Sequence, residues 1–86
     1  MKMNLLILDA RDTVAVALEP LPRGALCSFG SGGVMAAESI PFAHKIALRS
    51  ISRGSPVIKY GESIGVALCD ITEGDWVHTH NVSTTL

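Results

Sequence analysis

The sequence predicts an all-β, β-dominated domain. Apolar or alternating runs are short and rich in Val, Ile and Thr, turn residues recur between them, and no amphipathic helical stripe exceeds two turns. At 86 residues the chain is expected to form a single domain, residues 1–86. A domain of this size buries only about 60% of the surface that its unfolded chain exposes. Its own core is therefore thin, and pairing with another chain would help to stabilise it.

Eight short runs are expected to form strands. The first is apolar and ends before Asp9, and the second alternates β-branched residues with alanine. Glycines at 32 and 33 predict a turn between the third and fourth runs, because glycine tolerates positive φ. Residues 60–62 predict a hairpin turn between the sixth and seventh. The expected strands are residues 3–8, 13–18, 25–29, 33–37, 45–48, 56–59, 64–68 and 76–81.

A quasi-repeat relates three parts of the chain. Each copy has an Ala-Leu pair, an apolar residue three positions later and a glycine three positions after that. The pattern predicts one bent β-element used three times, in which the apolar residue fills the core and the glycine reverses the chain. Coincidence in a composition rich in Ala, Leu, Ile and Gly is the alternative. The members are Ala17-Leu18, Leu21 and Gly24; Ala47-Leu48, Ile51, Gly54 and Val57; and Ala67-Leu68, Ile71, Gly74 and Val77.

Composition and motifs exclude several classes of function. The net charge of −1 gives no electrostatic case for binding nucleic acid or an anionic membrane. No run approaches the roughly 20 residues of a membrane helix, and Asp9 interrupts the first apolar run before it could serve as a signal peptide. We therefore expect a cytoplasmic protein in which Cys27 and Cys69 are reduced. The chain contains no P-loop, dinucleotide fingerprint, nucleophile elbow or HExxH motif.

The chemistry-bearing side chains gather in two segments, one around His44 and one around His78 and His80. Two histidines separated by one residue lie on the same face of a strand, where they can bind a metal ion or an anionic substrate. Asn81 can orient a carboxylate or a hydroxyl because its amide both donates and accepts, and Lys45 can hold a carboxylate by its charge. The alternative is that these are surface side chains without a ligand.

Three segments in this order resemble a known family. They are Ile-Pro-Phe-Ala-His-Lys-Ile-Ala-Leu at residues 40–48, Val-Ile-Lys-Tyr-Gly-Glu at 57–62 followed by Ile-Gly at 64–65, and Gly-Asp-Trp-Val-His-Thr-His-Asn at 74–81. The order resembles the amino-terminal SAF domain of altronate/galactarate dehydratases. That domain is similar in turn to a separate small subunit of sulfolactate sulfo-lyases. The family usually has glycine in place of Ala43 and often valine in place of Thr79, and the 30–33 turn has no match in it.

The resemblance implies a small SAF-type β-clip fold and a role beside a larger catalytic lyase chain. That chain would dehydrate a sugar acid such as altronate or galactarate, or remove sulfite from sulfolactate. A divalent metal, commonly iron, is implied as a Lewis acid shared with the large chain. His44, His78 and His80 are then the candidate catalytic residues, and His78 and His80 the candidate metal ligands. Lys45 and Asn81 are the candidate substrate-binding residues.

Two other functions are compatible with the same sequence. The first is a non-catalytic SAF-type module that binds a sugar acid or a protein partner, in which His78 and His80 would be dispensable for turnover by any partner enzyme. The second is a structural homo-oligomer with a strand-swapped core. A small lyase subunit, by contrast, would be inactive alone and active only with its large partner.

Overall fold

The computed structural model of the chain describes residues 3–84 and confirms the all-β prediction. No helix occurs in this part of the chain, so it holds none that is long and apolar enough to cross a membrane. Cys27 is buried, Cys69 is exposed, and both are free thiols. The strands are β1 (Leu5–Leu6), β2 (Val14–Ala17), β3 (Leu26–Ser28), β4 (Gly33–Met35), β5 (Lys45–Ala47), β6 (Pro56–Lys59), β7 (Glu62–Ala67), β8 (Trp76–Val77) and β9 (Val82–Ser83).

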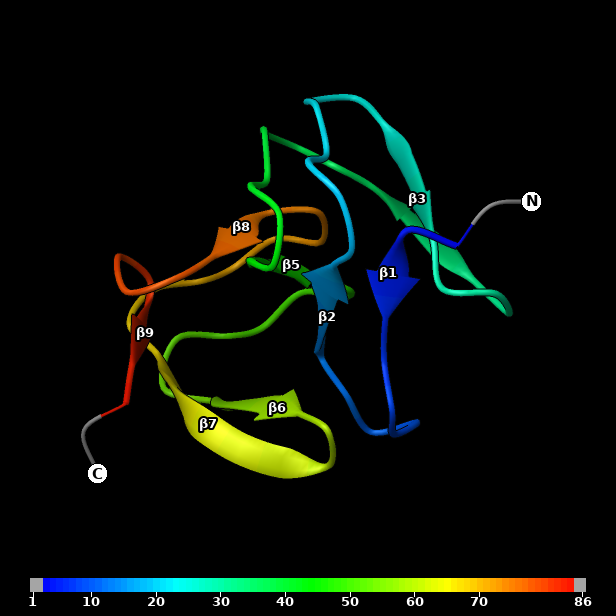
Figure 1. Cartoon of the computed structure of the whole chain (residues 1–86). Helices are drawn as coiled ribbons and strands as arrows, with labels where there is room; N and C mark the ends of the chain where they lie inside the picture. Colours follow the sequence, from blue (N-terminus) through cyan, green and yellow to red (C-terminus); the bar gives the residue numbers. More distant parts are fainter. Residues whose placement is uncertain (1–2, 85–86) are drawn as a thin grey trace.

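The strands form three small antiparallel sheets. A four-stranded sheet has the order β1-β2-β5-β8, β3 and β4 form a hairpin, and a three-stranded sheet has the order β6-β7-β9. The four-stranded sheet lies between the β3–β4 hairpin and the β6–β7 hairpin (Figure 1). It therefore contacts every other part of the fold.

The four-stranded sheet separates two hydrophobic clusters. Ala15, Ala17 and Ile46 pack into a cluster with β1, β3 and β4, whereas Val14 and Ala47 pack into a second cluster with β6, β7 and β9. This division follows from the alternation of side chains along a strand, which sends neighbouring residues to opposite faces. Each cluster is small, which agrees with the thin core expected of a chain of this length.

The quasi-repeat is real and has a fourth copy, which begins at Ala36, has Ile40 at the apolar position and has Ala43 at the turn position. In each copy the turn residue has positive φ: Gly24 (85°), Ala43 (69°), Gly54 (84°) and Gly74 (91°). In each, the amide after the turn residue donates to the carbonyl two residues before it, over 2.9–3.1 Å. These are the features of a type II turn, whose third position requires positive φ and therefore favours glycine.

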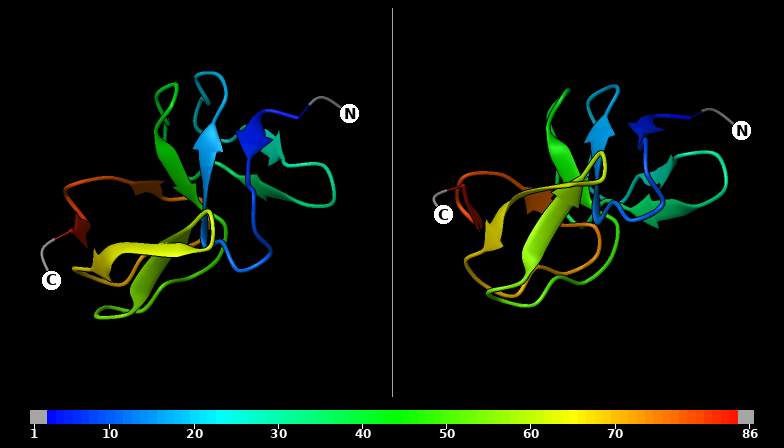
Figure 2. Two further views of the ribbon diagram at one scale, coloured as in Figure 1. Left: turned by 60° about the horizontal axis from the view of Figure 1, so that its bottom comes forward. Right: turned by 90° about the horizontal axis from the view of Figure 1, so that it is seen from below.

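The four copies pair two by two. Leu21 forms a β-bridge with Ile40, and Ile51 forms one with Ile71, and all four side chains are buried. In all four copies the amide of the turn residue donates, over 2.8 Å, to the carbonyl of the alanine that begins the partner copy. The turns around residues 20 and 40 consequently project side by side (Figure 2). The apolar position of the repeat thus holds a pair of turns together across the core.

One expected strand is wrong, and others are shorter than expected. Residues 76–81 do not form a single strand, because β8 ends at Val77, the chain turns, and β9 begins at Val82. The turn is closed by the amides of Asn81 and Val82, which both donate to the carbonyl of His78 over 3.1 and 3.0 Å. β6 covers the expected residues 56–59, whereas β1 keeps only two residues of the expected 3–8.

Candidate functional site

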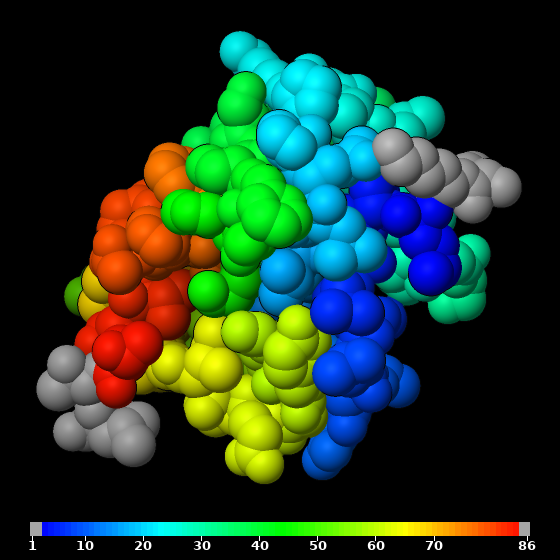
Figure 3. Space-filling view, viewed as in Figure 1, coloured from blue at the N-terminus to red at the C-terminus, as the bar shows by residue number. Residues whose placement is uncertain are grey.

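The two histidine-bearing segments meet at the edge of the four-stranded sheet. The antiparallel register pairs Lys45 of β5 with Val77 of β8 and therefore brings His44 and His78, the next residues outward, together. Their ring centroids are 4.6 Å apart with an interplanar angle of 35°. In the space-filling view, the orange and red surface after residue 70 adjoins the green surface around residue 40 (Figure 3).

Trp76 is the centre of this cluster. Its indole N–H donates to Nδ1 of His44 over 3.1 Å, and its ring stacks on that of His78 with centroids 5.6 Å apart and an angle of 12°. His80 lies against the same indole at 5.2 Å. A carboxylate oxygen of Glu38 accepts the backbone N–H of Trp76 over 3.0 Å and fixes the strand at this point. All three histidines of the chain therefore contact one aromatic ring. We call Trp76 with these three histidines the histidine rim.

The rim favours particular protonation states. Because Nδ1 of His44 accepts the indole N–H, a neutral His44 carries its own proton on Nε2. The pKa of His78 is lowered from its usual value, first by partial desolvation and then by the nearby charges of His44, Lys45 and His80. A lowered pKa keeps His78 neutral over more of the pH range, and a neutral imidazole can accept a proton or bind a metal ion.

Asn81 shapes the rim through the backbone. Its side chain is buried, its Oδ1 accepts the N–H of His78 over 2.9 Å, and its Nδ2 donates to the carbonyl of Trp76 over 2.9 Å. Both ends of the amide are thus engaged within the turn. This arrangement favours a positioning role for Asn81 rather than the direct substrate contact that the sequence suggested.

The histidine pair is brought to the rim by a different geometry from the one that the spacing implied. His78 and His80 do not share the face of a strand, because residues 79–81 form a turn. They meet at Trp76 because this turn folds back over the indole ring. The sequence indicated neither Glu38 nor Trp76 as a site residue. No pattern in the sequence links Glu38, 38 residues before Trp76, to that backbone N–H.

A pocket of about 230 Å³ opens beside the rim. Its polar lining includes Lys45, Lys59, Thr79 and the rim residue His78. Lys45 therefore lies where the sequence expected it, next to the histidines. Lys59 comes from β6 in another sheet, and the sequence did not indicate it as a site residue. We call this hollow the lysine pocket.

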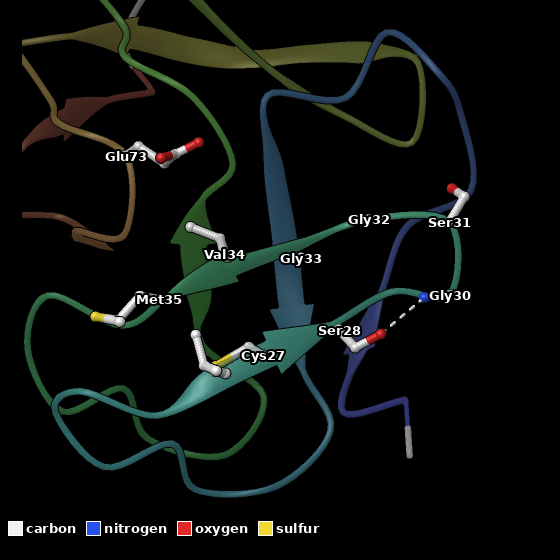
Figure 4. A pocket seen from close by; sticks show the side chains of 10 residues that line it. Cys27, Ser28, Gly30, Ser31, Gly32, Gly33, Val34, Met35 and Glu73 are labelled. Carbon is white, nitrogen blue, oxygen red and sulfur yellow. Dashed lines mark hydrogen bonds between the residues drawn. The ribbon is translucent and has the colours of Figure 1, made fainter. Parts of the chain in front are cut away.

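A larger hollow of about 420 Å³ lies along the β3–β4 hairpin (Figure 4). The 30–33 turn borders this hollow, and Oγ of Ser28 accepts the N–H of Gly30 over 3.2 Å. A Cβ atom on Gly33 would lie 2.6 Å from the carbonyl oxygen of Cys27, so the hairpin requires glycine there. The lining contains neither histidine nor lysine. The candidate chemistry therefore lies at the histidine rim and the lysine pocket.

The histidine rim offers nitrogen donors, but within residues 3–84 it does not form a complete metal site. Imidazole nitrogens suit iron and zinc, and His78 and His80 offer two of them. Within residues 3–84, however, no three His, Cys, Asp or Glu side chains are grouped to hold a metal ion. Metal sites of this kind use three or four protein ligands. His78 and His80 alone are too few to complete such a site.

Comparison with known proteins places the chain in a family. The model of the altronate/galactarate dehydratase SAF domain matches residues 3–85. The chain is 43% identical to altronate dehydratase of Escherichia coli (strain K12) over 84 residues, which cover 98% of this chain and 17% of that protein. It is 36% identical to altronate dehydratase of Bacillus subtilis (strain 168) over 76 residues, 88% of this chain and 15% of that protein. The chain thus spans less than a fifth of these dehydratases.

A third relative has nearly the length of this chain. It is (2R)-sulfolactate sulfo-lyase subunit alpha of Chromohalobacter salexigens, 33% identical over 94 residues that cover 98% of this chain and 97% of that subunit. The all-β fold, the family match and this subunit-length relative agree with one another. The chain belongs to the altronate/galactarate dehydratase SAF domain family and is homologous to the sulfolactate sulfo-lyase alpha subunit.

Proposed function

We propose that this chain is the small subunit of a lyase and contributes the histidine rim to the active site of a larger catalytic chain. Its relatives carry the names of dehydratases and of a sulfo-lyase subunit, so a lyase-associated small domain is the common theme. The name "subunit alpha" implies that the sulfo-lyase has at least one more subunit. By analogy, the partner of this chain is a large lyase subunit, and the complex is cytoplasmic.

The gathering of all three histidines on Trp76, beside a lysine-lined pocket, is the observation that carries the proposal. The substrates named by the relatives share a carboxylate, an α-hydroxyl and a leaving group on the β-carbon. Elimination from such an acid requires proton transfers, and imidazole is the side chain best suited to them near neutral pH. In the proposed complex Lys45 neutralises the carboxylate and the histidines act on the carbons next to it. The presence of Lys45 and His78 in the lining of one pocket supports this assignment.

A divalent metal, when bound, would supply Lewis-acid activation of the hydroxy acid. His78 and His80 are the residues of this chain that would hold it, and iron is the metal that the family implies. Hydrogen bonding to the substrate and proton transfer would be performed by this chain's own side chains. His44, held by Trp76 at Nδ1, offers its Nε2–H as a hydrogen-bond donor. The single lone-pair nitrogen of neutral His78 would be occupied by the metal when one is bound, and would be free to accept a proton otherwise.

Reconstitution tests the proposal. The chain is mixed with a purified altronate dehydratase large chain that lacks its own SAF domain, and turnover of altronate is measured. We expect no turnover by the small chain alone and activity in the mixture. The double variant His78→Ala/His80→Ala should lower kcat about 100-fold or more, the scale of a lost acid–base group. Arg53→Ala, a change at an exposed side chain away from the rim, is the control.

Two results would contradict the proposal. Full turnover by the small chain alone would show that no large chain is needed. An unchanged kcat in the double variant would favour the second candidate, a non-catalytic module that holds the acid. That candidate is favoured by the lysine pocket, which can bind an acid without any histidine taking part. It predicts a weaker binding constant, with kcat intact, when Lys45 is replaced.

A further inference from the structure

The lysine pocket joins two cationic side chains from separate sheets. Lys45 belongs to β5 of the four-stranded sheet, and Lys59 is the last residue of β6. Both side chains are half-buried and line the same pocket of about 230 Å³. Nζ of Lys59 lies 4.9 Å from the centroid of the Tyr60 ring, a contact that holds the ammonium group in place. The tertiary structure therefore brings two lysine side chains from separate sheets to one pocket.

Within residues 3–84 no ion pair joins a carboxylate to Lys45 or Lys59, although Glu62 stands opposite Lys59 in the β6–β7 register. The ion pair found within residues 3–84 joins Arg11 to Asp9, which line neither side of this pocket. Burial lowers the pKa of Lys45 from its usual value, and the charge of Lys59 lowers it further. Two like charges that approach each other in a partly desolvated site repel, and a bound anion would relieve that repulsion. A bound anion would therefore interact favourably with both lysines.

The rest of the lining suits the end of an organic acid. Val77 and Val82 provide apolar walls, while Thr79 and Thr84 offer hydroxyl groups. The volume is below the roughly 300–1,000 Å³ of typical ligand pockets. It suits one end of a sugar acid, with the remainder extending past His78 onto the rim.

We propose that Lys45 and Lys59 together form a subsite for the carboxylate of a hydroxy acid, beside His78. Lys59 is thereby a substrate-binding residue in addition to those that the sequence indicated. The hydroxy-acid class rests on the proposed lyase function, whereas the anion site itself rests on the two lysines. A carboxylate held here places the carbons next to it at the edge of the histidine rim.

Binding to the chain alone tests this subsite. Amide chemical shifts of the 15N-labelled chain are followed during titration with galactarate and, separately, with galactitol, which has the same carbon skeleton and no carboxylate. We expect galactarate to shift the amides of Val77, His78 and Thr79 and galactitol to leave them unchanged. Lys59→Met and Lys45→Met should each raise the dissociation constant at least fivefold, while Arg53→Met should change it less than twofold. Methionine keeps the apolar stem of lysine without its charge.

Sulfate distinguishes a hydroxy-acid site from a general anion site. We expect sulfate at equal ionic strength to bind at least fivefold more weakly than galactarate. Equal binding of the two would overturn the assignment to a hydroxy acid. Two results would contradict the subsite itself. One is that 50 mM galactarate, about ten times the dissociation constant of a weak millimolar ligand, shifts none of these amides. The other is that Lys59→Met binds galactarate as well as the wild type does.

The subsite and the proposed lyase function are tested by different measurements, so either can be rejected without the other. The titration uses the chain without a large subunit and without turnover, whereas the lyase function is tested by kcat of the reconstituted complex. Loss of galactarate binding in Lys59→Met together with full kcat in His78→Ala/His80→Ala would support the subsite and reject the catalytic rim. Unchanged galactarate binding in Lys59→Met together with a lowered kcat in His78→Ala/His80→Ala would support the catalytic rim and reject the subsite.

Discussion

The indole N–H of Trp76 donates a hydrogen bond to Nδ1 of His44 across 3.1 Å, joining β8 to the residue that precedes β5. The bond has a chemical consequence as well as a structural one. It places the proton of a neutral His44 on Nε2, and it holds the imidazole against the ring that also carries His78 and His80. Trp76 is therefore a positioning residue for the histidine rim.

Replacing Trp76 with Phe removes this donor while keeping an aromatic ring. We expect His44 to lose its fixed tautomer, because nothing then favours a proton-free Nδ1. Two-bond 1H–15N correlation spectra of the histidine side chains measure the tautomer directly. The wild type should show His44 with its proton on Nε2, and the variant a mixture of both forms. Phe29→Leu, a change at another aromatic side chain that packs against the same core cluster as Trp76, should leave the wild-type pattern intact. An unchanged His44 spectrum in Trp76→Phe would refute the prediction.

The lowered pKa of His78 makes stability depend on pH. The unfolded chain takes up a proton on His78 as the pH falls below about 6.5, whereas the folded chain takes it up only at a lower pH. The contribution of neutral His78 is therefore fully present above pH 6.5 and is lost as the pH falls through the window below it. Urea unfolding at pH 7.5 and pH 5 should show a smaller loss of stability in His78→Gln than in the wild type. Thr79→Ser, in the same turn, should lose as much as the wild type, and an equal loss in all three proteins would contradict this expectation.

Ala43 is expected to carry backbone strain that glycine would remove. It has φ of 69° at the third position of a type II turn, where the other three copies of the repeat have glycine. The left-handed conformation costs an L-residue about 1–2 kcal/mol, and the greater entropy of unfolded glycine offsets about 0.5–1 kcal/mol of the gain. We expect Ala43→Gly to raise the free energy of unfolding by about 0.5–1 kcal/mol, with a rise of a few degrees in Tm.

Ala37→Gly is the matched control for Ala43→Gly. Ala37 is exposed and does not have positive φ, so the same chemical change there only adds chain entropy to the unfolded state. Thermal unfolding should show Tm falling in Ala37→Gly and rising in Ala43→Gly. A fall in both variants would mean that the turn at Ala43 carries no strain that glycine can relieve.

Asn81→Ala should destabilise the turn that carries His78 and His80. The change leaves the N–H of His78 and the carbonyl of Trp76 without their partner, and unsatisfied groups of this kind cost about 1–3 kcal/mol each. Because both groups are only half-buried, we expect a loss of about 2–3 kcal/mol in total. Chemical denaturation measures it, and Thr84→Ala, at an exposed position, should stay within about 0.5 kcal/mol of the wild type. A loss no larger than that in Asn81→Ala would count against the positioning role.

Much of the fold could be predicted because its signals are local. The glycine of each copy comes three positions after its apolar residue, and the structure places these glycines in paired type II turns. The sequence pattern did not predict the fourth copy, because Ala43 stands where the other copies have glycine. The turn within residues 76–81 was not predicted, because the alternating residues there also fit a strand. The side chain of Asn81 closes this turn. The alternation of apolar and polar residues cannot distinguish a strand from a turn when one side chain replaces the hydrogen bonds of the strand.

The sequence by itself determined the all-β class, the turn positions and which residue types are available for chemistry. These follow from backbone preferences and hydrophobic alternation, which act over a few residues. The tertiary structure alone decided that His44 and His78 meet, through the β5–β8 register, and that all three histidines contact Trp76. It also decided that Lys59 of β6 joins Lys45 of β5 in one pocket. Strand pairing brings together residues that lie far apart in the chain, and no spacing within a single segment records that contact.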